Sequence, residues 1–195
     1  GRPGVPGGGG GGAGATAVVV GAGQTPGTTI GNGRAISLRL AQEGASLLCV
    51  DRDRASAEET VAMVRDAGGE AEPWCADITR EVECESIAAA ALERWGHVDV
   101  LVNNVGIGTG DAGATKLTEG AWDLIHDVNV KGAWMTCKHL LPHMRERGSG
   151  SVVNISSVAA VGSTRSVAHK TSKAGMSALT QQLAVSSSRL GVRGK

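Results

Sequence analysis

The stretch AVVVGAGQTPGTTIGNGRAI, residues 17–36, decides the fold of this chain. A short β-branched run ends in a glycine-rich turn, and the turn leads into a helical pattern. Glycines allow the backbone to approach a pyrophosphate closely, and the N-terminus of a helix offers free N–H groups and a positive dipole charge. We therefore predict that this turn binds a dinucleotide, through Gly21, Gly31, Asn32 and Gly33.

The position of the turn gives this signal its strength. A glycine-rich loop alone is a weak indication, because it can simply be a loop. Here the loop follows the first predicted strand and precedes the first predicted helix, which is the context that a dinucleotide-binding turn requires. The loop is longer than usual by about five residues around 24–29, which leaves its path open.

The rest of the chain alternates short apolar runs with longer helical patterns. The predicted strands are residues 17–20, 46–50, 70–74, 98–102 and 151–155. The predicted helices are residues 34–43, 55–67, 80–95, 118–147 and 168–190. Most of the strand runs are almost continuously apolar, as expected when helices cover both faces of a sheet. This order predicts an α/β fold with a doubly wound parallel sheet of the Rossmann type.

Length and composition favour one domain. The 195 residues are 41% hydrophobic, which suffices for one substantial core and leaves little for a second. Residues 1–15, GRPGVPGGGGGGAGA, have almost no side chains to bury, so we expect a disordered glycine-rich tail. The predicted dinucleotide-binding domain is therefore residues 16–195.

Charge and cysteine usage exclude several classes of function. Nineteen Lys and Arg balance nineteen Asp and Glu, so we expect no surface dedicated to nucleic acid or to an anionic membrane. No apolar stretch approaches the length of a membrane span. The four cysteines show neither a CxxC pair nor metal-ligand spacing, so we expect no metal site and a location in the reducing cytoplasm. The expected partner is a small molecule.

Asp51 follows the second predicted strand and lies eighteen residues beyond Gly33. An acid near this position accepts hydrogen bonds from both hydroxyls of the adenosine ribose, and its charge repels a 2′-phosphate. The sequence therefore predicts NAD as the cofactor, while Arg52 and Arg54 keep NADP open as the alternative. A solvated aspartate in a turn is the competing interpretation, and it suits Asp53 better than Asp51.

Several motifs in the same order resemble the short-chain dehydrogenase/reductase family, from about Thr16 to Arg193. The glycine-rich turn resembles the family's cofactor motif with an insertion. Asp77, in CADIT, resembles the acid near the adenine, and Asn104 and Gly106, in NNVG, resemble the motif that closes the fourth strand beside the cofactor. The resemblance implies an oxidoreductase that exchanges hydride between a nicotinamide and a carbonyl or secondary alcohol.

The resemblance also implies a catalytic set. Asn129, in DVNVKG, resembles the asparagine that holds a proton-relay water, and Ser157, in NISS, resembles the serine that hydrogen-bonds the substrate carbonyl. Lys173 stands where the family has the lysine that binds the nicotinamide ribose. Without the resemblance, Lys173 one helical turn after His169 still indicates a shared helix face, although this spacing alone also arises by coincidence.

The motif HKTSK, residues 169–173, has His169 where the family has tyrosine. A phenol beside a cation keeps its proton at rest and can protonate a developing alkoxide. A histidine beside Lys173 is expected to be mostly neutral at neutral pH, which makes it a weak acid but a reasonable base for alcohol oxidation. The imidazole nitrogen also stops short of the phenolic oxygen position. Because a misplacement of about 1 Å can cost roughly 100-fold, we expect strongly reduced activity.

The chain ends in SRLGVRGK, residues 188–195, where the family would begin its sixth strand. We therefore expect the usual C-terminal part to be missing, with an exposed sheet edge and an open wall of the substrate pocket. Two further hypotheses follow: a non-catalytic pseudo-enzyme that holds a dinucleotide or only assembles with partners, and a truncated product that folds poorly. By resemblance alone, we expect a homodimer or homotetramer formed through the helices at 118–147 and 168–190.

Overall fold

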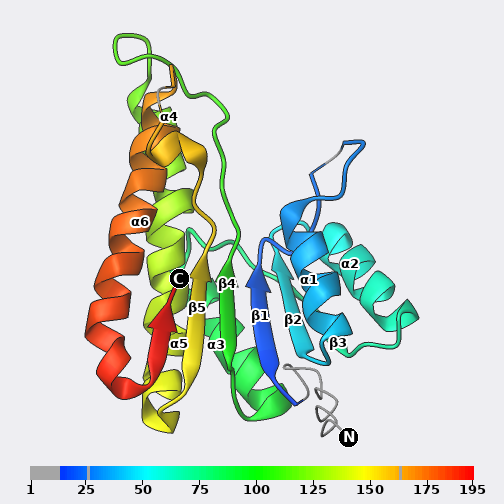
Figure 1. Ribbon diagram of the computed structural model, residues 1–195. Coiled ribbons are helices and arrows are strands. Elements are labelled where there is room, and N and C mark those ends of the chain that lie inside the picture. Colours follow the sequence, from blue (N-terminus) through cyan, green and yellow to red (C-terminus); the bar gives the residue numbers. More distant parts are fainter. Residues whose placement is uncertain (1–13, 26, 163) are drawn as a thin grey trace, which may run out of the picture.

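The computed structural model describes residues 14–25, 27–162 and 164–195. The disordered tail predicted at residues 1–15 therefore lies outside the described residues, except for Gly14 and Ala15. The described residues form one parallel sheet with helices on both faces (Figure 1). Its strands are β1 (Thr16–Val20), β2 (Ser46–Asp51), β3 (Ala71–Cys75), β4 (Val100–Asn103), β5 (Gly150–Asn154) and β6 (Val192–Gly194).

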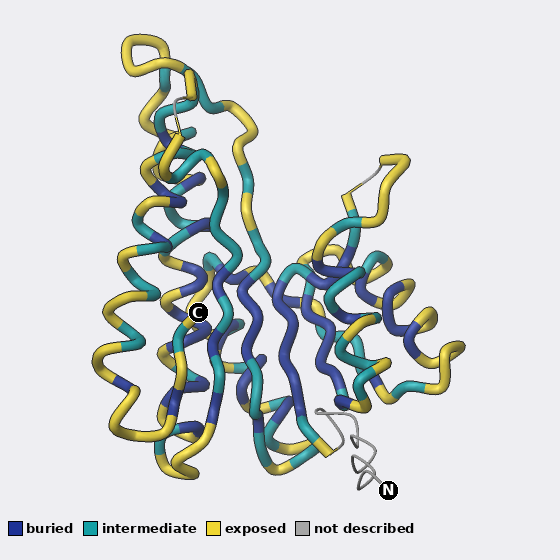
Figure 2. Tube along the Cα trace, viewed as in Figure 1, coloured by how far each residue is buried: buried dark blue, intermediate teal, exposed yellow. Residues whose placement is uncertain are grey.

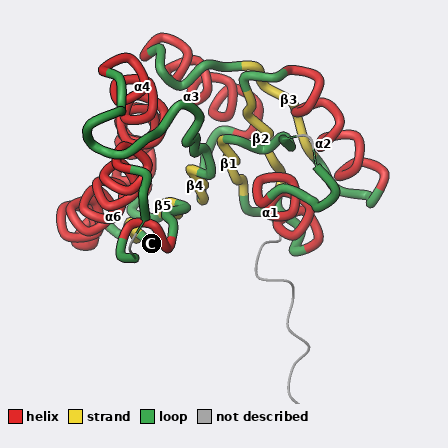
Figure 3. The backbone as a smooth tube through the Cα atoms, turned by 90° about the horizontal axis from the view of Figure 1, so that it is seen from above, coloured by secondary structure: helices red, strands yellow, loops and turns green. Residues whose placement is uncertain are grey.

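The helices divide between the two faces of the sheet, as the view along the strands shows (Figure 3). One face is covered by α1 (Asn32–Gln42) and α2 (Arg54–Asp66). The other face is covered by α3 (Glu81–Trp95), α5 (Gly132–Arg147) and α6 (Val167–Ser187), while α4 (Glu119–His126) packs against α6 beyond the carboxyl ends of the strands (Figure 1). This arrangement confirms the predicted doubly wound α/β fold.

The strand order is β3-β2-β1-β4-β5-β6, so the chain reverses its direction of winding between β1 and β4. In the register of the sheet, Val20 at the end of β1 lies beside Val50 of β2 and Asn103 of β4. In open α/β sheets, ligands bind outside the carboxyl ends of the strands at such a switch point. The topology therefore places the candidate site at the end of β1.

The core consists of two apolar layers, one on each face of the sheet. Alternate residues of β1 serve different layers: Val18 and Val20 pack with α3 and α5, whereas Ala17 and Val19 pack with α1 and α2. Since both layers are closed, the central strand β1 is buried along its whole length (Figure 2). This burial explains the almost continuous apolar runs of the sequence.

The structure differs from the sequence prediction in two places. The helix predicted at 118–147 is divided by a π-helical turn, Asp127–Lys131, which joins α4 to α5. The chain also forms the sixth strand that we expected to be absent: β6 pairs in parallel with β5, with Gly150 beside Val192. The edge of the sheet therefore lies one strand further out than predicted.

Candidate functional site

A pocket of about 410 Å³ lies at the carboxyl ends of β1 to β4. Its volume falls in the range of small-molecule and cofactor sites. Its walls come from the ends of these strands and the segments that follow them, together with Leu124 of α4 and Val128 of the π-helical turn, so they span positions 20 to 128 of the sequence. Eight of the residues predicted to bind a cofactor line it: Gly21, Gly31, Asn32, Gly33, Asp51, Asp77, Asn104 and Gly106.

Glycines allow the close contact between β1 and α1 on which the pocket is built. Gly21 has φ of 79°, a left-handed conformation that side chains disfavour. A Cβ on Gly33 would lie 1.8 Å from the carbonyl oxygen of Gly21. No residue larger than glycine fits at Gly33, so the N-terminus of α1 lies directly against the end of β1.

The first turn of α1 faces the pocket with its backbone donors. Its N-cap is Gly31, which has no side chain to cap the helix. Among the described residues, no acceptor is hydrogen-bonded to the N–H groups of Asn32 and Gly33. Unpaired N–H groups at a helix N-terminus form an anion-binding site.

The inserted loop is fixed to β2 and α2. The Gly23 N–H donates to Asp51 Oδ2 at 2.9 Å, and the Gln24 N–H donates to Ser56 Oγ at 2.7 Å. The side chain of Gln24 closes the loop, since its Oε1 accepts the Gly31 N–H at 3.0 Å. These contacts bring the Asp51 carboxylate to the glycine-rich turn.

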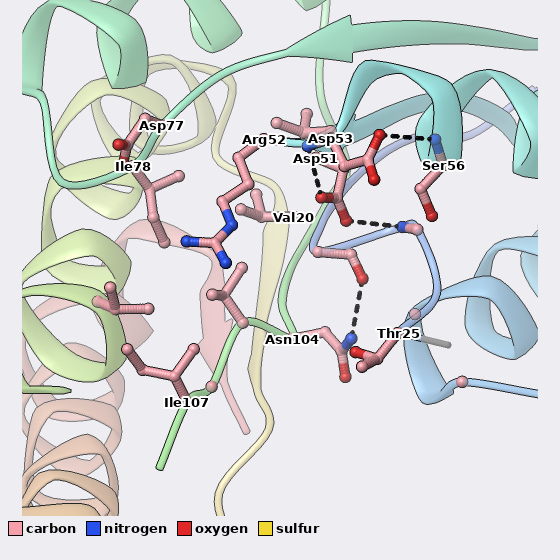
Figure 4. Close-up of a pocket in the computed structure, with 18 of the residues that line it drawn as sticks. Val20, Thr25, Asp51, Arg52, Asp53, Ser56, Asp77, Ile78, Asn104 and Ile107 are labelled. Carbon is pink, nitrogen blue, oxygen red and sulfur yellow. Dashed lines mark hydrogen bonds between the residues drawn. The ribbon is translucent and has the colours of Figure 1, made fainter. Parts of the chain in front are cut away.

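The far wall of the pocket carries charge of both signs. Figure 4 shows the Arg52 side chain reaching across the pocket between Val20 and Ile78, with Asp77 at the rim. Burial raises the pKa of Asp77, but hydrogen bonds from Thr79 and the charge of Arg52 outweigh it and leave the pKa below its ordinary value. Asp77 also accepts both the N–H and the hydroxyl of Thr79, so it stabilises its own turn.

Asn104 and Gly106 connect the pocket to α6. The Asn104 side chain donates to the Gly21 carbonyl at 3.0 Å and so joins β4 to the glycine-rich turn. Gly106 lies against Lys173, because a Cβ at Gly106 would be 2.8 Å from Lys173 Nζ. Lys173 therefore reaches the edge of the pocket, although it belongs to α6.

Lys173 is only 4% exposed. Its ammonium group donates to the carbonyl oxygens of Ile155 at 2.8 Å and Val105 at 3.3 Å. Burial lowers the pKa of this lysine, because the charged form loses water on the way into the protein. Lys173 thus joins the segment after β4 to the segment after β5.

Asn129 and His169 both contact the backbone of Ile107. Asn129 is fully buried in the π-helical turn, where its Oδ1 accepts the Ile107 N–H at 2.8 Å and its Nδ2 donates to the Ile107 carbonyl at 2.9 Å. The ring of His169 lies with Nδ1 3.1 Å from the same carbonyl oxygen. π-helical turns often occur at functional sites, because they redirect a side chain within a helix.

Ser157 lies on the connection between β5 and α6. It begins a short 3-10 turn, Val158–Ala160, and its Oγ accepts the Ala159 N–H at 3.1 Å. Lys170 ties this turn to α6 by donating to the carbonyls of Ala159 and Gly162. The connection between β5 and α6 is thereby held to the helix that carries His169 and Lys173.

The sequence matches the short chain dehydrogenase family over residues 15–194, a range that includes every residue of the candidate site. The chain belongs to this family. Short-chain reductase protein NovJ of Streptomyces niveus is 37% identical over 169 residues, which are 86% of this chain and 62% of that protein. The chain spans about three fifths of the length of the curated relatives that it matches first, 63% and 62%.

Two solved structures of oxidoreductases have the same fold as this chain. NAD+-bound xylitol dehydrogenase superimposes with a TM-score of 0.88 at 30% identity, over 94% of this chain and 69% of that one. A metagenomic short-chain oxidoreductase in complex with NADP superimposes with a TM-score of 0.86 at 30% identity, over 93% and 80%. Both cofactors therefore occur among solved structures similar to this chain.

Some residues that shape the site carry no recognisable motif in the sequence. Ser56 and Gly23 fix the inserted loop, and Asp111 accepts hydrogen bonds from the start of α6. No motif marks Asp111, because it stands in the glycine-rich run GTGDAGA and its partners on α6 lie more than fifty residues away. Within the described ranges, no group of three His, Cys, Asp or Glu could hold a metal ion.

Proposed function

We propose that this chain carries the cofactor pocket and the proton-transfer group of an NAD(P)-dependent oxidoreductase. The reaction is hydride transfer between a nicotinamide and the carbon of a carbonyl or secondary alcohol. The observation that carries the proposal is the gathering of eight predicted cofactor residues in one pocket at the switch point of the sheet. Similar proteins are named as dehydrogenases and reductases, which does not favour the non-catalytic alternative.

The pocket fits a dinucleotide in its backbone and its donors. Gly21 and Gly33 are in close contact and have no side chains, so nothing at these two positions keeps a pyrophosphate away from the backbone. The unpaired N–H groups of Asn32 and Gly33 are suitable donors to its phosphate oxygens. When bound, the cofactor supplies the hydride chemistry, and the protein supplies position and electrostatics.

Asp51 supports NAD over NADP. Its Oδ2 accepts the Gly23 N–H and its Oδ1 accepts the Asp53 N–H, and each oxygen keeps capacity for a ribose hydroxyl. A 2′-phosphate at this place would be repelled by the carboxylate. Arg52 reaches into the same pocket, however, and its charge would favour that phosphate, so the preference is expected to be moderate.

The proposed catalytic roles follow the family pattern. Ser157 would hydrogen-bond the substrate oxygen, Lys173 would orient the nicotinamide ribose, and Asn129 would connect the site to solvent. His169 would stand where the family has its tyrosine and would exchange the proton with the substrate. Because Lys173 is held by two carbonyls beside Gly106, its ammonium group is already ordered at the pocket edge.

Calorimetric titration with NAD and NADP side by side tests the cofactor site. We expect tighter binding of NAD. Asp51→Ser should weaken NAD and strengthen NADP, whereas Asp53→Ser removes the same charge nearby while serine still caps α2. If neither cofactor binds the folded wild-type chain, the proposal fails.

Turnover of secondary alcohols and ketones tests the proton-transfer role. His169→Tyr should raise the turnover strongly, because the phenolic oxygen reaches further and carries the proton that the family uses. His169→Gln should lower it further. If both variants bind NAD like the wild type and neither changes the turnover, the pseudo-enzyme is the correct reading.

We also propose that the chain assembles as a homodimer or homotetramer in the cytoplasm. Large apolar side chains are exposed on α4 and α5: Trp122 is 38% and Trp134 is 45% exposed. In the described part of the chain, no helix is long and apolar enough to cross a membrane. Analytical ultracentrifugation should find an oligomer that Trp134→Glu weakens. A monomer at all concentrations would refute the assembly.

A further inference from the structure

The helix that carries His169 is capped by a residue distant in sequence. The N-cap of α6 is Ser166, whose side chain caps none of the helix N–H groups. Asp111 takes this role: its Oδ1 accepts the Val167 and Ala168 N–H groups, both at 3.1 Å. Its Oδ2 accepts the N–H of His169 at 2.7 Å. The backbone of His169 is therefore bonded directly to Asp111.

The charge of Asp111 suits this position. Burial raises the pKa of its carboxyl, but backbone hydrogen bonds from His169, Ala168, Ala112 and Val167 outweigh the burial and leave the pKa below its ordinary value. A carboxylate at a helix N-terminus is also favoured by the helix dipole. Asp111 consequently holds the first turn of α6 as an ionised acceptor throughout the neutral pH range.

The contact between His169 and Ile107 determines where the imidazole proton lies. The Ile107 carbonyl oxygen can only accept, so Nδ1, 3.1 Å away, must carry the hydrogen. This carbonyl is fixed, because Asn129 binds both the N–H and the C=O of Ile107. In the neutral ring, Nε2 then has the lone pair, and no residue in the described ranges is hydrogen-bonded to it.

We propose that Asp111 is a positioning residue that, together with the Ile107 carbonyl fixed by Asn129, holds His169 as the Nδ1–H tautomer and leaves Nε2 to accept a substrate proton. The proposal rests on the proposed function for the identity of the substrate, a secondary alcohol. The alcohol O–H bond breaks and its proton moves to Nε2, while the hydride leaves the carbinol carbon for the nicotinamide of bound oxidised cofactor and the carbonyl forms. The neutral ring has no proton on Nε2 to donate, so the chain is suited to oxidation of the alcohol.

Long-range 1H–15N correlation spectra of the imidazole rings test the proposal on the chain without cofactor, at about pH 8.5, where a histidine ring is ordinarily neutral. The chain has five histidines, and His169→Gln identifies the signals of His169. We expect Nδ1 to show the protonated, pyrrole-type shift and Nε2 the unprotonated, pyridine-type shift. The reverse assignment in the wild type would overturn the proposal.

Asp111→Asn and Asp111→Ala test the part of Asp111. Both should convert His169 from one tautomer to a mixture, seen as a loss of separation between its two nitrogen shifts, and Asp111→Glu should restore part of it. Asp53→Asn is the matched control, because Asp53 caps α2 in the same way without touching α6. If folded Asp111→Asn keeps the wild-type tautomer, Asp111 does not position the ring.

The tautomer of His169 and its catalytic role are tested by separate measurements. The tautomer is read without cofactor or substrate, so its result stands even if the chain turns over nothing. If the tautomer is as proposed and the chain is active, the ratio of alcohol oxidation to ketone reduction should fall several-fold in Asp111→Asn relative to Asp53→Asn. An unchanged ratio, with the tautomer altered, would refute the assignment of Nε2 as the base.

Discussion

Gly33→Ala should weaken both the folded state of this chain and its binding of the cofactor. The added Cβ would lie 1.8 Å from the Gly21 carbonyl oxygen and 2.8 Å from Asn104 Nδ2, far inside contact distance. Helix α1 and the end of β1 must therefore move apart by more than an ångström. This movement also breaks the hydrogen bond from Asn104 to Gly21, which joins β4 to the turn.

The expected cost follows from these contacts. Overpacking costs about 1–3 kcal/mol and the hydrogen bond about 1 kcal/mol, while alanine in a helix returns roughly 0.5–1 kcal/mol. The net loss is about 2 kcal/mol, which lowers the melting temperature of a chain of this size by roughly 4–8 °C. Displacing the helix N–H groups from a phosphate costs about 1.5–3 kcal/mol, so NAD should bind roughly 10- to 100-fold more weakly.

Thermal unfolding and calorimetric titration measure the two effects, and Gly31→Ala is the matched control. A Cβ on Gly31 would meet its nearest neighbour, Gln24 Cγ, at 3.6 Å, and its φ of −69° suits alanine. Gly31→Ala should lose less than about 1 kcal/mol of stability, the cost of a poorer N-cap. If Gly33→Ala melts and binds NAD like Gly31→Ala, the close contact of β1 with α1 is not what shapes the pocket.

Three further measurements test charges and thiols. The pKa of Asp111 is lowered from its ordinary value of 3.8, so this carboxylate stabilises the folded chain above pH 3.8 and stops doing so as the pH falls through the folded-state pKa. In urea unfolding, the stability of Asp111→Ala should therefore fall less steeply with acid than that of the wild type. Burial lowers the pKa of Lys173 from its ordinary value of 10.5. Just below pH 10.5 the unfolded chain therefore binds more protons than the folded chain, and the free energy of unfolding of the wild type rises with pH. Lys173→Met should abolish this rise, and an unaltered slope of stability against pH would contradict the argument. In the folded chain, a disulfide reagent should quickly modify one thiol, that of the exposed Cys75. The other three thiols are buried, and burial raises the pKa of Cys49 to about 11. Fast labelling of the Cys75→Ser variant would refute this expectation.

Strands buried on both faces were the easiest elements to predict. The run at 17–20 predicted β1 within one residue, because helices on both faces make every position apolar. Strand β6 was missed, because three residues at the sheet edge contain only one buried apolar side chain, Val192, and show no period. Its formation depends on pairing with β5, which is a property of the fold.

The cofactor residues were predictable and the connections between them were not. Glycines and acids directly after strands meet at one edge of a parallel sheet, so Gly21, Asp51 and Asn104 could be expected in one pocket. Asp111 gave no signal, because an aspartate among glycines usually indicates a turn. Its function in the fold comes from backbone N–H groups far along the chain, which no local pattern encodes.

The π-helical turn at Asp127–Lys131 places one extra residue between α4 and α5. A π-helical turn absorbs such a residue locally, so the helices on either side face as they would in a continuous α-helix. Deleting one residue of the turn would therefore restore regular α-helix and keep both Ile125 and Met135 in the core. Asn129, in contrast, would lose its place beside the backbone of Ile107. Sequence drift can therefore remove this turn at little cost to packing, but the same deletion would disconnect the helix from the site.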